Sequence, residues 1–522
     1  MARAKSVRRT ARKSLKIKVK TQKDILKEAL ATSSEALTCV KRKIKKDLKA
    51  EHRLAMLNTG APLTSDIIAA YSSDYKQDKL NTHRENTLSA LPLSYCCESR
   101  KFLQTVNYSY SHSLERVPLA TSQAHSGRCW LFAALNSMRY YLMRELHLPD
   151  DFELSEAYLF FYDKIEKANC FLEKIILNRN ADTNDPRLAK IMSGPVDDGG
   201  LWSFVSNLIK KYGIVPKTIY AESFNSSVTD EMNQVLTDKL AQFANDIRLN
   251  KAKSDQHLRS MVLQQMLPVI YQILSNFMGE PPGSDTEFSW EYHEVGEHAQ
   301  QVRHKGTYHL VKGLTPIKFY KTYIEGHYDV SEMVLLRNDP RSTSVYMQVY
   351  TGELQSNMVG GQPELAFNLS MEDIKAITAK TVINGHPVWF GCEVQRDFNP
   401  YYGLLAVEGY DYDSMLGLKM DQTKEESILT RNGGPSHAMA IVGLNVTKET
   451  ENGPVVDKWK IENSWGEFNI GDPGYLQMTD TWFDRYGYEV VVPIDMLPDN
   501  LRDIYEECRA RPIVLPFTDP LA

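Results

Sequence analysis

The stretch that decides the fold of this 522-residue chain is Gln123-Ala-His-Ser-Gly-Arg-Cys129-Trp-Leu-Phe-Ala-Ala-Leu135. Small and polar residues lead into Cys129, and an apolar stretch without proline follows it, which predicts a loop that enters a helix. A thiol in the first turn lies at the positive end of the helix dipole, where a thiolate is stabilised. The side-chain amide of Gln123 can donate a hydrogen bond near the sulfur. The stretch therefore predicts a nucleophile and an oxyanion donor on one loop.

Composition places the chain among ordinary globular proteins, because 42% of its residues are hydrophobic and 24% are charged. The seven cysteines are odd in number and scattered, and no C-x-x-C pair occurs, which indicates a reduced intracellular protein without a thiol metal site. No apolar run reaches the roughly 18 residues of a membrane span. No apolar segment near the start resembles a secretory signal. We therefore expect a cytoplasmic protein that does not enter the membrane.

Charge is unevenly spread along the chain. Residues 1–60 hold 18 Lys and Arg against 5 Asp and Glu, whereas the remainder holds 43 against 61. Such a basic extension is typical of a disordered solvated tail, of a mitochondrial transit peptide, or of an arm that binds nucleic acid by neutralising phosphates. The sequence leaves these three interpretations open, and a mitochondrial form is the alternative to a cytoplasmic location.

Hydrophobic spacing changes character along the rest of the chain. Residues 129–147 predict a helix, Ser155 is a candidate cap for a second, and residues 198–202 form a turn into a third. Residues 229–280 are helical in pattern. After about residue 305 short β-rich runs appear, at 344–351, 388–394, 438–446, 459–463 and 488–492. The predicted organisation is a helical half, a helical insertion and a β half.

A cysteine nucleophile needs a base within hydrogen-bond reach, and the base needs a group that orients it. His125 lies on the cysteine loop itself, whereas His437 heads the apolar strand pattern Ala-Met-Ala-Ile-Val-Gly-Leu and is placed to face a cleft. Asn463 ends another short strand, and its carbonyl can accept a hydrogen bond from one imidazole nitrogen. Trp465 can cover that bond and exclude water, which strengthens it. The three residues form a nucleophile, base and orienter in the order Cys129, His437, Asn463.

These segments resemble the papain superfamily of cysteine peptidases. Gln123 with Ser126-Gly-Arg-Cys-Trp130 is similar to the oxyanion and nucleophile segment, His437-Ala to the base, and Asn463-Ser-Trp-Gly to the orienter. Asp198-Gly-Gly-Leu-Trp202 resembles the segment that borders the substrate cleft. Arg128, residues 154–163, residues 474–483 and the long insertion are typical of the bleomycin hydrolase branch, called aminopeptidase C in bacteria. The resemblance covers roughly residues 60–522.

The resemblance implies an α+β, papain-like fold, with a helical half and a β-barrel-like half separated by a long helical insertion. It places the peptidase at 61–522, with the helical half at about 100–225, the insertion at about 226–335, the β half at about 336–500 and a C-terminal arm at about 501–522. Cys129, His437 and Asn463 would be catalytic, Gln123 the oxyanion donor, and Gly199, Gly200, Trp465 and Ala522 part of the substrate cleft. No metal or organic cofactor is required.

The family's function is aminopeptidase action on peptides, together with hydrolysis of the bleomycin amide, in a homohexamer; some members bind nucleic acid without sequence preference. The C-terminal carboxylate would attract the substrate amine and block longer chains. Two features depart from the family pattern: the ending at Ala522 is slightly shorter than usual, and residues 431–436 interrupt the lead-in to His437. A catalytically silent ring scaffold and a nucleic-acid-binding ring protein are the alternative functions.

Overall fold

The computed structural model describes residues 60–116, 118–295, 306–450 and 453–522, so the predicted basic extension lies outside the described residues except for Gly60. The chain divides into two compact units, Met1–Ala90 and Leu91–Ala522. The first contains α3 (Ser65–Gln77) and α4 (Lys79–Leu88). Thr64 and Asp78 cap these helices by accepting hydrogen bonds from backbone N–H groups of their first turns.

The helical half of the second unit is built around α7 (Cys129–Glu145), α8 (Glu156–Leu177) and α10 (Trp202–Tyr212). The predicted cap of the second helix is confirmed, because the Ser155 side chain accepts a hydrogen bond from the N–H of Tyr158. Helix α7 is buried almost all round, which fits its long apolar run. The smaller helices of this part are α5 (Leu93–Cys97), α6 (Arg100–Leu103), α9 (Pro186–Met192) and α11 (Phe224–Ser227).

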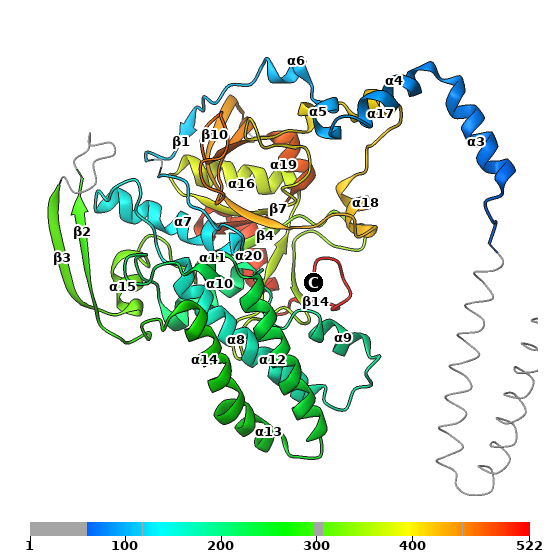
Figure 1. Ribbon diagram of the computed structural model, residues 1–522. Helices are drawn as coiled ribbons and strands as arrows, with labels where there is room; N and C mark the ends of the chain where they lie inside the picture. Colours follow the sequence, from blue (N-terminus) through cyan, green and yellow to red (C-terminus); the bar gives the residue numbers. More distant parts are fainter. Residues whose placement is uncertain (1–59, 117, 296–305, 451–452) are drawn as a thin grey trace, which may run out of the picture. The chain divides into compact units, whose positions relative to one another are not determined.

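The helical pattern predicted for 229–280 is confirmed by α12 (Asp230–Leu249), α13 (Asp255–Met261) and α14 (Leu267–Met278). A short π-helical segment, η1 (Val262–Met266), joins the last two. These helices extend together away from the sheet (Figure 1). A hairpin of β2 (Phe288–Glu294) and β3 (Thr307–Leu314) follows, and α15 (Pro316–Tyr323) returns the chain to the core.

The β half is one large, mostly antiparallel sheet, with twelve strands in the described part of the chain. Its central strands are β4 (Met333–Arg337), β13 (Gly487–Pro493), β7 (Val388–Cys392), β10 (His437–Thr450) and β11 (Gly453–Glu462), which lie side by side in that order. The outer strands are β1 (His112–Ser113), β5 (Gln348–Gly352), β6 (Ala366–Asn368), β8 (Phe398–Asn399), β9 (Leu404–Leu405), β12 (Tyr475–Thr479) and β14 (Ile513–Leu515). The helices and turns between them are α16 (Met371–Ile383), η2 (Val407–Gly409), α17 (Tyr412–Leu416), α18 (Lys424–Leu429), α19 (Asp480–Tyr486), η3 (Ile494–Met496) and α20 (Asp499–Cys508).

Two hydrophobic cores hold the second unit together, one in the helical half and one between the sheet and α16. Helix α7 packs directly against β10 and β7. The indole N–H of Trp389 on β7 donates to the carbonyl of Trp130 at 3.2 Å, which fixes the start of α7 against the sheet. The α+β architecture, with a helical and a β half, is as predicted. Within the described residues, no helix is both long and apolar enough to cross a membrane.

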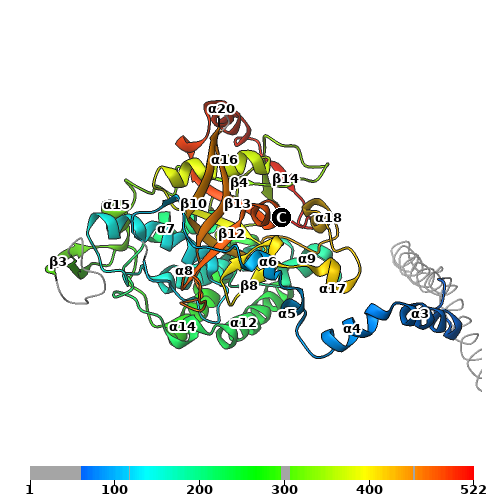
Figure 2. The same cartoon turned by 90° about the horizontal axis from the view of Figure 1, so that it is seen from above.

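Figures 1 and 2 show the C-terminal end of the chain beside β14, between α9 and α18. Strand β14 pairs in parallel with β5, and residues 516–522 then turn back toward the middle of the unit. The end of the chain therefore lies between the helical and the β half.

Candidate active site

The cysteine loop, residues 121–128, is held by a short antiparallel pairing with residues 464–466. The N–H of Gln123 donates to the Ser464 carbonyl and the N–H of Gly466 to the Thr121 carbonyl, both at 2.8 Å. The Ser464 hydroxyl donates to the side-chain carbonyl of Gln123 at 2.7 Å. The Gln123 amide nitrogen donates to the Ser126 carbonyl at 2.6 Å, and its second N–H is left for a ligand. Hydrogen bonds of both its backbone and its side chain thus hold Gln123 beside the cysteine.

Cys129 is the first residue of α7, as predicted, and it is partly buried. The backbone N–H groups of Ala438, Trp130 and Cys129 itself lie near its sulfur and favour the thiolate. Ala438 directly follows His437, so this contact brings the head of β10 to the thiol. The structure therefore brings together two segments that are more than 300 residues apart in the sequence.

His437 and Asn463 form the predicted pair. The imidazole Nε2 lies 2.9 Å from the Asn463 carbonyl oxygen, and Asn463 is fully buried. With Nε2 protonated by this arrangement, Nδ1 is the nitrogen that can accept a proton. The ring of Trp465 covers the pair, with its centroid 4.8 Å from that of the imidazole. Trp465 thus shields the bond from water, as expected from the sequence.

Burial shifts both catalytic candidates toward their neutral forms. It raises the pKa of the Cys129 thiol, although the N–H groups at the sulfur work in the opposite direction. It lowers the pKa of His437 to about 4, against the effect of the Asn463 hydrogen bond. The helix N-terminus alone predicts a thiolate, but removal of water opposes an isolated charge on either group.

Asp198 ties the wall of the site to the cysteine loop and to the helical insertion. Its carboxylate accepts hydrogen bonds from Gly127 N–H at 3.0 Å, Thr229 at 2.5 Å and Asn233 at 2.7 Å, and it pairs with Lys164 at 2.7 Å. Burial opposes its ionisation, yet the charge of Lys164 and these hydrogen bonds hold the pKa of Asp198 well below its usual range. Burial lowers the pKa of Lys164 to about 8. The sequence does not reveal this network, because no spacing links Asp198 to its partners.

Arg128, next to the nucleophile, is completely buried. One guanidinium nitrogen, Nη1, donates to both carboxylate oxygens of Glu222, at 3.0 and 2.9 Å, and the Nε donates to the Ser126 hydroxyl. It also lies over the rings of Phe132 and Phe160, each about 5.2 Å away. Arg128 is thus a structural anchor for the loop, and Glu222 is a partner that the sequence does not single out.

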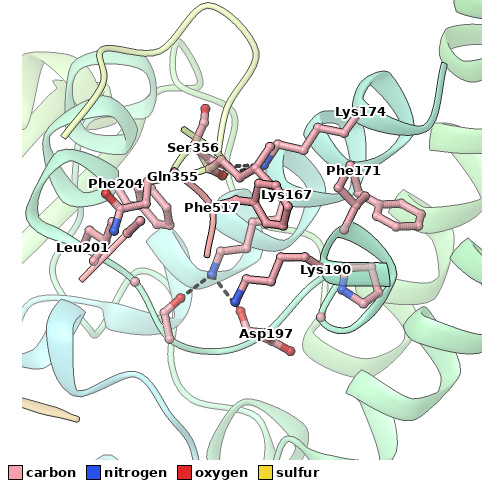
Figure 3. A pocket seen from close by; sticks show the side chains of 17 residues that line it. Lys167, Phe171, Lys174, Lys190, Asp197, Leu201, Phe204, Gln355, Ser356 and Phe517 are labelled. Atoms are coloured by element: carbon pink, nitrogen blue, oxygen red, sulfur yellow. Dashed lines mark hydrogen bonds between the residues drawn. The ribbon is translucent and has the colours of Figure 1, made fainter. Parts of the chain in front are cut away.

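The other predicted site residues lie around the same place. Gly200 is packed so closely on Trp130 that a side chain there would clash with the indole, whereas Gly199 is open. Gly199, Gly200 and Ala522 all line one pocket of about 370 Å³, shown in Figure 3. Lys167 forms part of its wall, donating to the carbonyls of Asp197 and Gly199 at 2.7 Å each. The end of the chain therefore shares a hollow with the segment beside the cysteine loop.

His125, the other histidine near the thiol in the sequence, has no place in this site. His125 is exposed and its backbone pairs with residues 227–228, so it does not compete with His437 as the base. In the described part of the chain, no group of three or more His, Cys, Asp or Glu side chains is arranged to hold a metal ion.

Replacing Asp198 by asparagine should lower the free energy of unfolding by about 3 kcal/mol, because the buried Lys164 amine would lose the carboxylate that pairs with it at 2.7 Å. Urea denaturation measures the change. The matched control is Asp197→Asn, which removes an exposed carboxylate from the adjacent residue. Equal destabilisation by the two variants would contradict the assigned role of the Asp198–Lys164 pair.

The free energy of unfolding should fall as the pH drops from about 6.5 to about 4, because His437 is buried. Its pKa in the folded chain lies below the unfolded value, so in this window the unfolded chain binds the proton more readily, and the loss approaches about 3 kcal/mol. Denaturation at pH 7.5 and pH 4 should show a smaller pH effect in His437→Gln than in the unchanged chain. An identical pH dependence in both would show that His437 is not buried in its neutral form.

Comparison with known proteins agrees with this geometry. The model of the Peptidase C1-like family matches residues 62–522. Human bleomycin hydrolase is 32% identical over 465 residues, covering 88% of this chain and 98% of that protein. Aminopeptidase C of Lactobacillus helveticus is 33% identical over 401 residues, covering 76% of this chain and 84% of that protein.

A solved structure shows the same fold. The crystal structure of PepW from Lactobacillus rhamnosis HN001 matches with a TM-score of 0.81 and 31% identity, over 88% of this chain and 99% of that one. The papain-like fold expected from the sequence is confirmed by this match. Since the family model spans most of its length and these relatives agree, the chain belongs to the Peptidase C1-like family of papain-like cysteine peptidases.

Proposed function

We propose that this chain is a thiol-dependent aminopeptidase that removes N-terminal residues from peptides, with Cys129 as nucleophile. One observation carries the proposal: the backbone N–H of Ala438 lies at the Cys129 sulfur, and the preceding residue, His437, is hydrogen-bonded to Asn463 at 2.9 Å. A nucleophile, a base and an orienter are thereby assembled at one point between the two halves of the fold. Relatives named bleomycin hydrolase and aminopeptidase C support the same class of reaction.

In the first step the Cys129 sulfur attacks the carbonyl carbon of the first peptide bond while its proton passes to Nδ1 of His437. A thiolate at Cys129 and an imidazolium at His437 attract each other, and the attraction is strong because the site is poorly hydrated. The carbonyl oxygen becomes an oxyanion, for which the Cys129 N–H and the second amide N–H of Gln123 are the donors. Loss of one such donor typically raises the barrier by about 3 kcal/mol.

In the second step the tetrahedral intermediate collapses. The C–N bond breaks, His437 gives its proton to the departing amine, and the N-terminal residue remains as a thioester on Cys129. Water, deprotonated by His437, then hydrolyses the thioester and restores the thiol. Asn463 keeps Nε2 occupied throughout, so the same nitrogen, Nδ1, serves as base and as acid.

Ala522 supports the restriction to N-terminal residues. It lines the same pocket as Gly199 and Gly200. A carboxylate at this position would attract a protonated substrate amine and leave no room for residues that precede the cleaved bond. Hydrolysis of the bleomycin amide belongs to the same proposal, and the relatives named bleomycin hydrolase support it.

The assembly and location of the chain belong to the proposal as well. The resemblance favours a homohexamer of cytoplasmic location, with a mitochondrial form as the alternative. Binding of nucleic acid would fall to residues 1–60, nearly all of which lie outside the described residues. A silent scaffold is disfavoured because the Cys129, His437 and Asn463 set is intact.

Catalytic variants test the assigned roles. Cys129→Ala should abolish hydrolysis of an aminoacyl amide, whereas Asn463→Ala should reduce kcat by roughly 10²-fold, since it removes only the orientation of the base. Asn445→Ala, on the same strand as His437, should leave the rate unchanged. Turnover that survives in Cys129→Ala would rule out the nucleophile, and a loss in Asn463→Ala as complete as that in Cys129→Ala would show that Asn463 does more than orient.

The C-terminal restriction is tested by removing Leu521 and Ala522. The full chain should hydrolyse a free aminoacyl amide much faster than its N-acetylated twin. The truncated chain should cleave the acetylated substrate relatively faster, because the blocking residues are gone and the terminal carboxylate has moved. The ratio of kcat/KM for the two substrates is the measurement. A ratio that truncation leaves unchanged would show that the end of the chain does not select substrates.

A further inference from the structure

The terminal segment, residues 516–522, is held by charged side chains from several distant elements. The N–H of Phe517 donates to Glu353 at 3.2 Å, and the carbonyl of Thr518 accepts from the Arg431 guanidinium. The Asp519 carboxylate makes a bidentate pair with Arg341, at 3.0 Å for each bond. The carbonyl of Leu521 accepts from Arg337 at 3.2 Å. Specific polar contacts therefore hold the segment along most of its length.

The pair between Arg341 and Asp519 is preorganised. Arg341 is buried and is also bound by Asp339, at 2.7 and 2.9 Å. Burial opposes ionisation of Asp339, but its hydrogen bonds from Arg341 and Ser344 lower its pKa. The guanidinium is therefore already oriented before the terminal segment arrives, which reduces the entropy cost of holding Asp519.

Arg337 connects the segment to the catalytic strand. Its guanidinium pairs with Glu489 at 2.7 Å, and both side chains are buried. Arg337, Glu489, Gly391 and Ala438 are successive register partners across β4, β13, β7 and β10. At about 4.8 Å per strand, the backbone of Arg337 lies roughly 14 Å from that of Ala438, whose N–H contacts the sulfur of Cys129. The row of partners therefore sets the distance between the Leu521 anchor and the nucleophile.

The segment that precedes His437 contacts the end of the chain through Arg431. Residues 431–436 run from the end of α18 to the first residue of β10, and Arg431 at their start reaches the carbonyl of Thr518. Arg431 also has a left-handed backbone, with φ of 58°. The segment that departs from the family pattern is thus also the one that contacts the end of the chain.

An apolar anchor completes the attachment. Leu521 is buried in a small cluster with Tyr350, Ile428, Tyr488 and Leu515, and Ala522 packs against it. The cluster positions the last side chain but does not determine the direction of the carboxylate, because apolar contacts are not directional. The arginines supply the directional part.

We propose that Arg337, Arg341 and Arg431 form a clamp that determines substrate specificity by fixing where Ala522 ends. The three arginines are positioning residues: they act on the terminal segment and not on the reacting atoms. This proposal rests on the proposed aminopeptidase function for its kinetic consequence, but the clamp itself is a structural claim. A variant that weakens the clamp should hydrolyse N-blocked peptides faster, while Cys129 stays able to react.

The clamp is tested first without reference to activity. Carboxypeptidase digestion followed by intact mass spectrometry measures how fast Ala522 and Leu521 are released. Asp519→Ala, which leaves Arg341 paired with Asp339, should speed release by roughly tenfold or more, because it removes the Arg341 pair and the 2.9 Å hydrogen bond that Asp519 accepts from the Leu521 N–H. Arg431→Ala should act in the same direction. The control Thr518→Ala, which changes an exposed side chain and keeps the carbonyl, should match the unchanged chain. Equal release from all four proteins would overturn the clamp.

The same variants then test specificity. The ratio of kcat/KM for an N-acetylated aminoacyl amide to that for the free amide should rise roughly tenfold in Asp519→Ala, while turnover of the free amide shows that Cys129 still works. Faster release with an unchanged ratio would overturn the specificity role of the clamp. A full chain that does not prefer the free amide would instead refute the aminopeptidase proposal, and the rates of release would then decide alone whether the clamp exists.

Discussion

The site depends on the short antiparallel pairing between residues 121–123 and 464–466. Two backbone hydrogen bonds of 2.8 Å join the cysteine loop of the helical half to the Asn463 segment of the β half. Backbone bonds of this kind fix both distance and direction, so Gln123 and Asn463 cannot move independently. The Asn463–His437 bond lies directly beside this connection.

Two ion pairs hold the cysteine loop in one position. Arg128 with Glu222 and Asp198 with Lys164 are buried, and each is supported by additional hydrogen bonds. Buried pairs contribute little net stability when well-packed apolar residues could replace them, but breaking one side is costly. They therefore suit a loop that must hold one geometry, and they connect the nucleophile to α8 and to the helical insertion.

The sequence predicts those parts of the site that have a local signature. The helix at Cys129, the strand headed by His437 and the cap at Ser155 follow from hydrophobic spacing and capping rules, and the structure places them as expected. Glu222, Lys164 and Arg341 could not be found in this way, because each is one charged residue among many and its partner lies elsewhere in the chain. Their roles depend on burial, which spacing does not encode.

The protonation state of the thiol shows the same limit of sequence-based prediction. A helix N-terminus favours a thiolate, whereas the packing of Trp465 over His437 and the burial of Asn463 remove the water that would stabilise separated charges. Only the three-dimensional structure shows this removal of water.

Cys129 is the proposed nucleophile among seven cysteines because His437 and Asn463 are assembled beside it. The most direct measurement is treatment with a thiol-reactive epoxide near neutral pH, followed by digestion and mass spectrometry of every cysteine-containing peptide. One adduct per chain, at Cys129, with labelling strongly slowed in His437→Gln, is the predicted result. Modification of other cysteines while Cys129 stays free, or labelling that is indifferent to His437, would contradict it.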